Sequence, residues 1–174
     1  GILLYNLPLG PAWWVSFSVG SVLLLLVFFA EYIVLDSADT RYTIASAVLI
    51  AVSFSLFLIL AAALSYAGTR LLLMILVVFP AAGLVSLRAM HLRLNGRWEW
   101  QWAIGIALAC SQFAAALHYW PLSPVQYGLL ALSPLYALTN LAIGLGEGNF
   151  PRRALIEAGI YLGLFWLSAL LLLR

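Results

Sequence analysis

The sequence predicts an all-α integral membrane protein, built as a bundle of six transmembrane helices. Of its 174 residues, 66% are hydrophobic and 8% are charged, whereas about a quarter of the residues of a soluble domain are charged. Twelve of the fourteen charged residues lie in three short stretches, residues 31–41, 88–99 and 147–157. Because a helix needs ~20 apolar residues to cross ~30 Å of hydrocarbon, the chain has room for six crossings and for no separate soluble domain.

Six hydrophobic segments account for most of the chain and predict a single transmembrane domain over residues 1–174. Runs of this length cannot leave backbone groups unpaired in lipid, and a barrel would show short alternating segments instead. Each crossing is therefore expected to be a helix. The expected helices are residues 13–35, 42–65, 69–87, 101–119, 124–145 and 154–173.

Interfacial and turn residues bound the first three helices. The Trp13–Trp14 pair opens the first helix, and indoles are typical of the membrane interface. The second and third helices are joined by the short Tyr-Ala-Gly segment at residues 66–68, which predicts a tight turn. The Asn95–Gly96 pair is expected to end any continuation of the third helix beyond the membrane.

The fourth helix carries a stripe of small residues. They recur every four positions, at Ala103, Ala107, Ser111 and Ala115. Small residues on one face let another helix backbone approach closely. We therefore expect the fourth helix at the centre of the bundle.

The last two helices carry a start signal and a glycine pair. Ser123 is expected to cap the fifth helix, and Pro124 suits its first turn, where the missing N–H costs nothing. Gly159 and Gly163 form one Gly-x-x-x-Gly motif in the sixth helix. Such a motif marks either a dimer face or packing inside the monomer, and we expect the second.

The arginines predict the orientation. If the helices alternate, six arginines lie on the side of the connections after the first, third and fifth helices, and two (Arg70 and Arg174) lie on the other. The positive-inside rule then predicts a multi-pass protein of the cell inner membrane with both termini external. All eight basic residues are arginine and none is lysine, which is typical of a GC-rich bacterium.

Ionisable residues beside the predicted cytoplasmic face form a candidate polar cluster. It comprises Glu31, Asp36, Asp39, Arg88 and His91. An ionisable group at the edge of the hydrocarbon is costly unless it faces protein, water or a partner. The cluster is either a metal or proton site or a set of solvated helix ends, and we expect the second because Glu31 and Asp36 do not share a helical face.

Four further arginines are candidate contacts for lipid headgroups: Arg93, Arg97, Arg152 and Arg153. With Arg88 and His91 they form either a specific site for an anionic headgroup or the ordinary belt of positive charge. Trp98, Trp100 and Trp102 follow closely and favour the belt, because indoles collect at the headgroup level. Glu157 lies four residues after Arg153, at a spacing that allows an ion pair.

No sequence signature names a reaction. The chain lacks the Gly-x-Ser-x-Gly, His-Glu-x-x-His, Cys-x-x-Cys and Walker motifs. We expect a non-catalytic accessory, scaffold or assembly subunit, with the lipid bilayer and other membrane subunits as partners, and no cofactor, metal or nucleic acid. The alternatives are a lipid-linked enzyme or small transporter that uses the polar cluster, and a pigment- or haem-binding subunit that uses His118 or His91.

Overall fold

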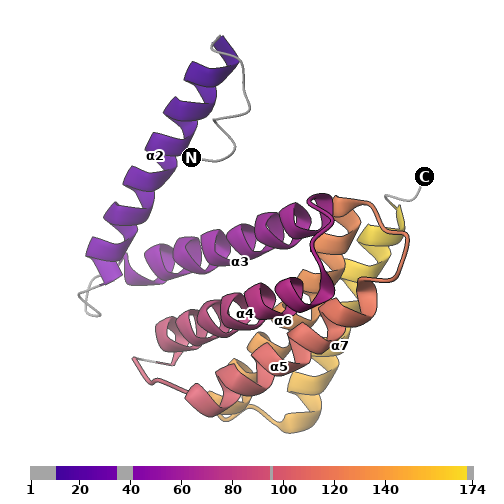
Figure 1. The fold of residues 1–174 in the computed structure, drawn as a ribbon. Coiled ribbons are helices and arrows are strands. Elements are labelled where there is room, and N and C mark those ends of the chain that lie inside the picture. Colours follow the sequence, from indigo (N-terminus) through magenta and orange to yellow (C-terminus); the bar gives the residue numbers. More distant parts are fainter. Residues whose placement is uncertain (1–10, 35–40, 95, 172–174) are drawn as a thin grey trace. The chain divides into compact units, whose positions relative to one another are not determined.

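The computed structural model describes residues 11–34, 41–94 and 96–171, and every described element is a helix. In chain order the helices are α2 (Pro11–Val34), α3 (Tyr42–Tyr66), α4 (Leu71–Arg93), α5 (Trp100–Leu117), α6 (Pro124–Gly146) and α7 (Pro151–Leu171) (Figure 1). The all-α prediction is confirmed. The helix bounds match the expected segments within a few residues, except that α4 continues six residues beyond Leu87.

Five helices, α3 to α7, are long and apolar enough to cross a membrane. The first expected segment corresponds to α2, of which the stretch Gly20–Val34 is apolar but shorter. Five possible crossings are therefore described, and the count of six stays a prediction.

The chain divides into two compact units after Leu49. The first, Gly1–Leu49, contains α2 and the start of α3. The second, Ile50–Arg174, contains the rest of α3 and helices α4 to α7. Within the second unit, α4 to α7 run in alternating directions, so the α4–α5 and α6–α7 connections share one end (Figure 1). We call this end, where α4 and α6 finish, the charged end.

The most buried helix of the second unit is α6. Of its most apolar stretch, 67% is buried, compared with 39% for α5. The prediction that the fourth helix, α5, lies at the centre is therefore wrong. The stripe of small residues instead allows close packing against one helix, α4. Ala107 faces α4, where its Cβ lies 3.4 Å from the position that a Cβ on Gly83 would take.

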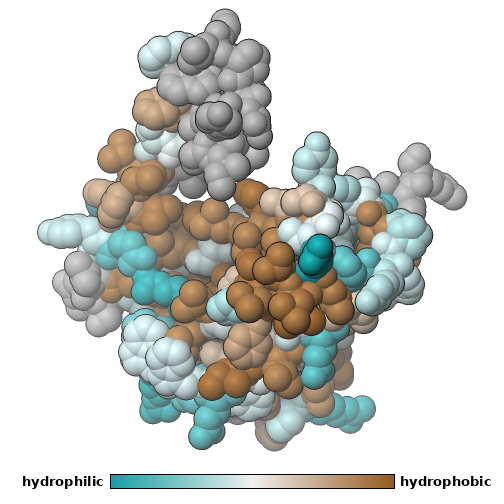
Figure 2. Space-filling view, viewed as in Figure 1, coloured by the Kyte–Doolittle hydropathy of each residue, from teal (hydrophilic) through white to brown (hydrophobic). Residues whose placement is uncertain are grey.

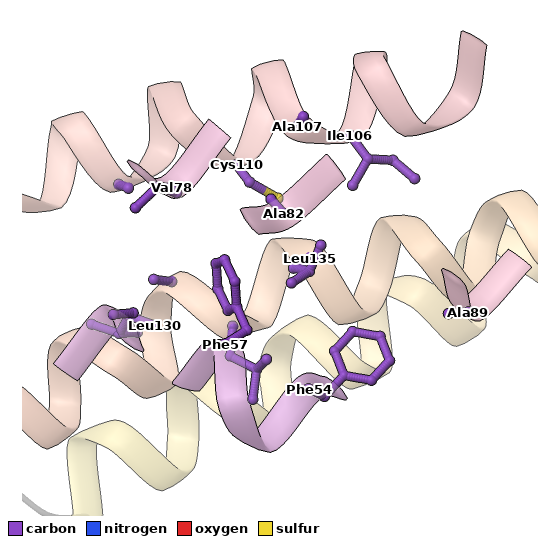
Figure 3. Packing of buried hydrophobic residues seen from close by; sticks show 14 of the residues in the cluster. Phe54, Phe57, Val78, Ala82, Ala89, Ile106, Ala107, Cys110, Leu130 and Leu135 are labelled. Carbon is purple, nitrogen blue, oxygen red and sulfur yellow. The ribbon is translucent and has the colours of Figure 1, made fainter. Parts of the chain in front are cut away.

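Close contacts join α6 to its neighbours in the second unit. A Cβ built on Gly128 would lie 3.0 Å from the carbonyl oxygen of Leu58 in α3. The Tyr127 hydroxyl donates to the carbonyl oxygen of Ala114 in α5 at 3.0 Å and lies 2.9 Å from Met74 Sδ in α4. Together these contacts place α6 against three helices, and Figure 3 shows buried residues of α3, α4, α5 and α6 in one cluster.

Local signals set the helix starts and connections as expected. Ser123 and Gln126 form a capping box at the start of α6, with Pro124 in the first turn. Gly68 follows α3 with φ +58°, a conformation that glycine adopts without steric cost. The predicted cap and the predicted tight turn are both confirmed.

The glycine pair of α7 does not pack inside the described structure. A Cβ built on Gly159 or on Gly163 would meet no described atom within 4 Å, and both residues are exposed. Within residues 11–34, 41–94 and 96–171, the structure therefore does not show the expected packing of this motif inside the monomer.

Candidate functional site

The C-terminal end of α4 and the turn that follows it form the first part of the charged end. The helix continues through Arg88 and His91 to Arg93, and Leu94 caps it with an N–H bond to the Met90 carbonyl oxygen at 2.8 Å. Gly96 then takes φ +83° and donates its N–H to the His91 carbonyl oxygen at 3.0 Å. This glycine-dependent closure confirms the predicted helix end and reverses the chain toward α5.

Aromatic rings cover the turn. The His91 imidazole stacks on Trp98 with ring centroids 4.0 Å apart and planes at 26°, and Trp98 stacks on Trp100 at 6.1 Å and 19°. Trp98 and Trp100 are exposed, and His91 Nδ1 is buried with no hydrogen-bond partner among the described residues. The stack holds α4 against the start of α5, and its exposed indoles suit the headgroup layer.

A cavity of about 400 Å³ opens beside this turn. We call it the mixed-charge cavity. Arg93 and Arg97 line it from α4 and the α4–α5 connection, and Glu99 lines it from the residue before α5. The end of α6 completes it with Gly146 and Glu147, and Leu94 is the remaining lining residue.

The packing of Leu94 on Gly146 shapes this cavity. A Cβ built on Gly146 would lie 3.0 Å from Leu94 Cδ2 and 3.1 Å from Cδ1. The absence of a side chain at Gly146 therefore lets the end of α4 lie close to the end of α6. As a result, charged residues from two distant parts of the sequence line one space.

The two arginines of α7 lie elsewhere. Arg153 Nε donates to Glu157 Oε1 at 3.1 Å, which confirms the predicted spacing, and both side chains are exposed. Arg152 is also exposed, and neither arginine lines the mixed-charge cavity. The four predicted headgroup contacts thus separate into a cavity pair, Arg93 and Arg97, and a surface pair.

The described structure does not test the candidate polar cluster. Asp36 and Asp39 lie outside the described residues. Glu31 belongs to α2 in the first unit, whereas Arg88 and His91 belong to α4 in the second. The grouping of these five residues stays a prediction, and no group of three possible metal ligands occurs among the described residues.

The two histidines lie at opposite ends of the second unit. His91 is in the last turn of α4, and His118 caps the far end of α5 with its ring edge-on to Tyr119 at 5.4 Å. Because α5 has 18 residues, these ends are separated by about 27 Å along the helix axis. The histidines of one chain therefore cannot both ligate one haem or chlorophyll.

Two apolar cavities lie on the sides of the same unit. One of about 240 Å³ follows the α4–α5 groove from Phe79 and Pro80 to Trp100. The other, of about 270 Å³, is lined by residues that include Trp120 and Trp166. Trp166 Nε1 is buried without a hydrogen-bond partner among the described residues.

Glu99 and Glu147 are site residues that the sequence pattern did not single out, although both border the arginine-rich connections. A signal was present, because the acids follow the same side of the chain as the arginines. Their meeting in one cavity depends on the contact between Leu94 and Gly146, which joins residues too distant in sequence for a periodic pattern to reveal.

Helices α3 to α7 are long and apolar enough to cross a bilayer. The structure therefore defines a multi-pass helical membrane protein. The chain belongs to the family described as "Protein of unknown function (DUF5656)", whose model matches residues 1–172. No curated protein and no solved structure matches the chain.

Proposed function

We propose that the protein is a non-catalytic accessory, scaffold or assembly subunit of a larger membrane complex, and that its charged end docks a partner. The observation that carries this proposal is the contrast between the interior and the charged end. Inside the second unit, the buried hydroxyls of Ser86, Ser111 and Ser133 donate to carbonyl oxygens of their own helices at 3.0, 2.8 and 2.8 Å. These three hydroxyls donate to their own backbone, and Thr139 Oγ1 is the one buried hydroxyl of this unit without a hydrogen-bond partner among the described residues.

The charged end presents its polar groups outward. Arg93, Arg97 and Glu147 are exposed there, and Glu99 is half-buried. Figure 2 shows hydrophilic side chains at the lower end of α4 to α7, where Figure 1 places the α4–α5 and α6–α7 connections. Charged groups on a partner would find complementary charges on this surface, which favours orientation and specificity of docking.

The test is purification of the full chain from its native membrane in a mild detergent, followed by native mass spectrometry of the complex. We expect a stoichiometric membrane partner, lost when Arg97 is replaced by Glu and retained when Arg70, at the opposite end, is replaced by Glu. Arg70 is exposed and precedes α4. Its replacement by Glu is therefore a control with the same change in charge as the replacement of Arg97. A chain that leaves the membrane without any stoichiometric partner would contradict an accessory role.

A further inference from the structure

The mixed-charge cavity places two guanidinium groups and two carboxylates around one space. Arg93 and Arg97 supply the positive charges, and Glu99 and Glu147 the negative ones. Within residues 11–34, 41–94 and 96–171, none of these four side chains forms an ion pair or a side-chain hydrogen bond. Charges of both signs thus line a cavity without neutralising one another by direct contact.

The position of the cavity points to the headgroup layer. It lies where α4 and α6, both long and apolar enough to span a membrane, reach their last residues. The exposed Trp98 and Trp100 lie beside it in the same connection, and indoles gather at the depth of the headgroups. The molecules present at this depth of the membrane are the lipid headgroups.

The charge pattern selects among headgroups. Guanidinium groups bind phosphate through short, charge-assisted hydrogen bonds, so Arg93 and Arg97 suit a phosphodiester. The two carboxylates would repel a purely anionic headgroup but attract an ammonium group. The volume of about 400 Å³ falls within the range of about 300–1,000 Å³ that is usual for small-ligand sites.

We propose that the mixed-charge cavity binds the zwitterionic headgroup of a phospholipid. The phosphate lies against Arg93 and Arg97, and the ammonium lies against Glu99 and Glu147. The protein thereby prefers zwitterionic to anionic phospholipids at this end of the bundle. This inference does not depend on the proposed accessory role, because a lone protein could hold the same lipid.

The experiment is native mass spectrometry of the purified full chain in a nonionic detergent. Phosphatidylethanolamine and phosphatidylglycerol with identical acyl chains are added at equal concentrations. We expect phosphatidylethanolamine to be retained at least about tenfold better, the size of effect that one charge-assisted hydrogen bond produces. Equal retention of both lipids, or preference for phosphatidylglycerol, would overturn the proposal.

Matched variants separate the cavity from the general surface. Glu99→Gln and Glu147→Gln should each reduce the preference, because each removes one of the two carboxylates of the ammonium site. Arg97→Gln should weaken retention of both lipids about tenfold. Glu157→Gln and Arg70→Gln remove the same charges from exposed positions outside the cavity and should change neither result. If the control variants act like the cavity variants, the binding is to the surface and the proposal is wrong.

Two further measurements test whether the bound molecule is a membrane lipid held by the folded chain. Each variant must elute from size exclusion like the unaltered chain. Soluble phosphoethanolamine at the same concentration should not displace the bound lipid. Displacement by the soluble compound would overturn the assignment to a membrane lipid.

Discussion

Replacing Gly128 by Ala should destabilise the second unit through one contact. A Cβ on Gly128 would lie 3.0 Å from the Leu58 carbonyl oxygen, 3.3 Å from the Ala62 Cβ and 3.4 Å from the Ala62 N. Two of these three atoms belong to the backbone of α3, so no side-chain rotation can relieve the overlap. The helices must separate, and overpacking of this kind costs about 1–3 kcal/mol.

Gly105→Ala is the matched control. Gly105 lies inside α5, and a Cβ there would meet no described atom within 4 Å. Both variants gain the same helix propensity, up to about 1 kcal/mol for Gly to Ala. The difference in stability between Gly128→Ala and Gly105→Ala therefore isolates the packing cost.

The assay is thermal unfolding of the purified chain in one detergent, followed by intrinsic tryptophan fluorescence. For a chain of this size, a change of about 1 kcal/mol shifts the transition by about 2–4 °C. The Gly128 variant should therefore unfold about 2–12 °C below the Gly105 variant, given a cost of about 1–3 kcal/mol. Equal transition temperatures would refute the close approach of α3 and α6 and, with it, the central position of α6.

Three further predictions test the core and the orientation. Tyr127→Phe removes the hydroxyl that donates to α5 and should lower the free energy of unfolding by about 0.6 kcal/mol, and by no more than about 1.7, whereas Tyr119→Phe, exposed, should have no measurable effect. Ala107→Leu, at a buried position facing α4, should reduce folded yield far more than Leu108→Ala, at an exposed one; similar yields would contradict the packing. In intact cells, a cysteine at Asn149 should resist an impermeant thiol reagent while one at Tyr119 reacts, and the reverse labelling would invert the predicted topology.

Hydropathy predicts the bounds of these helices within three residues, and the end of α4 is the exception. The sequence predicts a helix over residues 124–145, and α6 runs from Pro124 to Gly146, because capping signals and apolar length agree there. The third expected segment stops at Leu87, yet α4 continues to Arg93. The expected segment stops before the charged Arg88, whereas the helix continues because residues such as Met90 and Leu92 are buried.

The position of a helix within the bundle is harder to predict than its existence. The stripe of small residues on α5 marks close approach to one neighbour, as the contact between Ala107 and Gly83 shows. A central helix must instead be covered on several faces. On α6, Gly128 packs on α3, Tyr127 reaches α4 and α5, and the Gln126 side chain donates to a carbonyl oxygen of α7 at 3.4 Å. No single periodicity describes contacts that point in so many directions.

The mixed-charge cavity depends on packing as much as on charge. Its charged residues come from the ends of α4 and α6 and from the connection before α5, and these segments meet because Leu94 lies against Gly146. A side chain at Gly146 would displace Leu94 and change the separation of Arg93 from Glu147 without altering any charge. The proposed preference for a headgroup can therefore be changed at Gly146, an exposed residue of the cavity lining, and such a change would leave the arginine asymmetry that orients the protein intact.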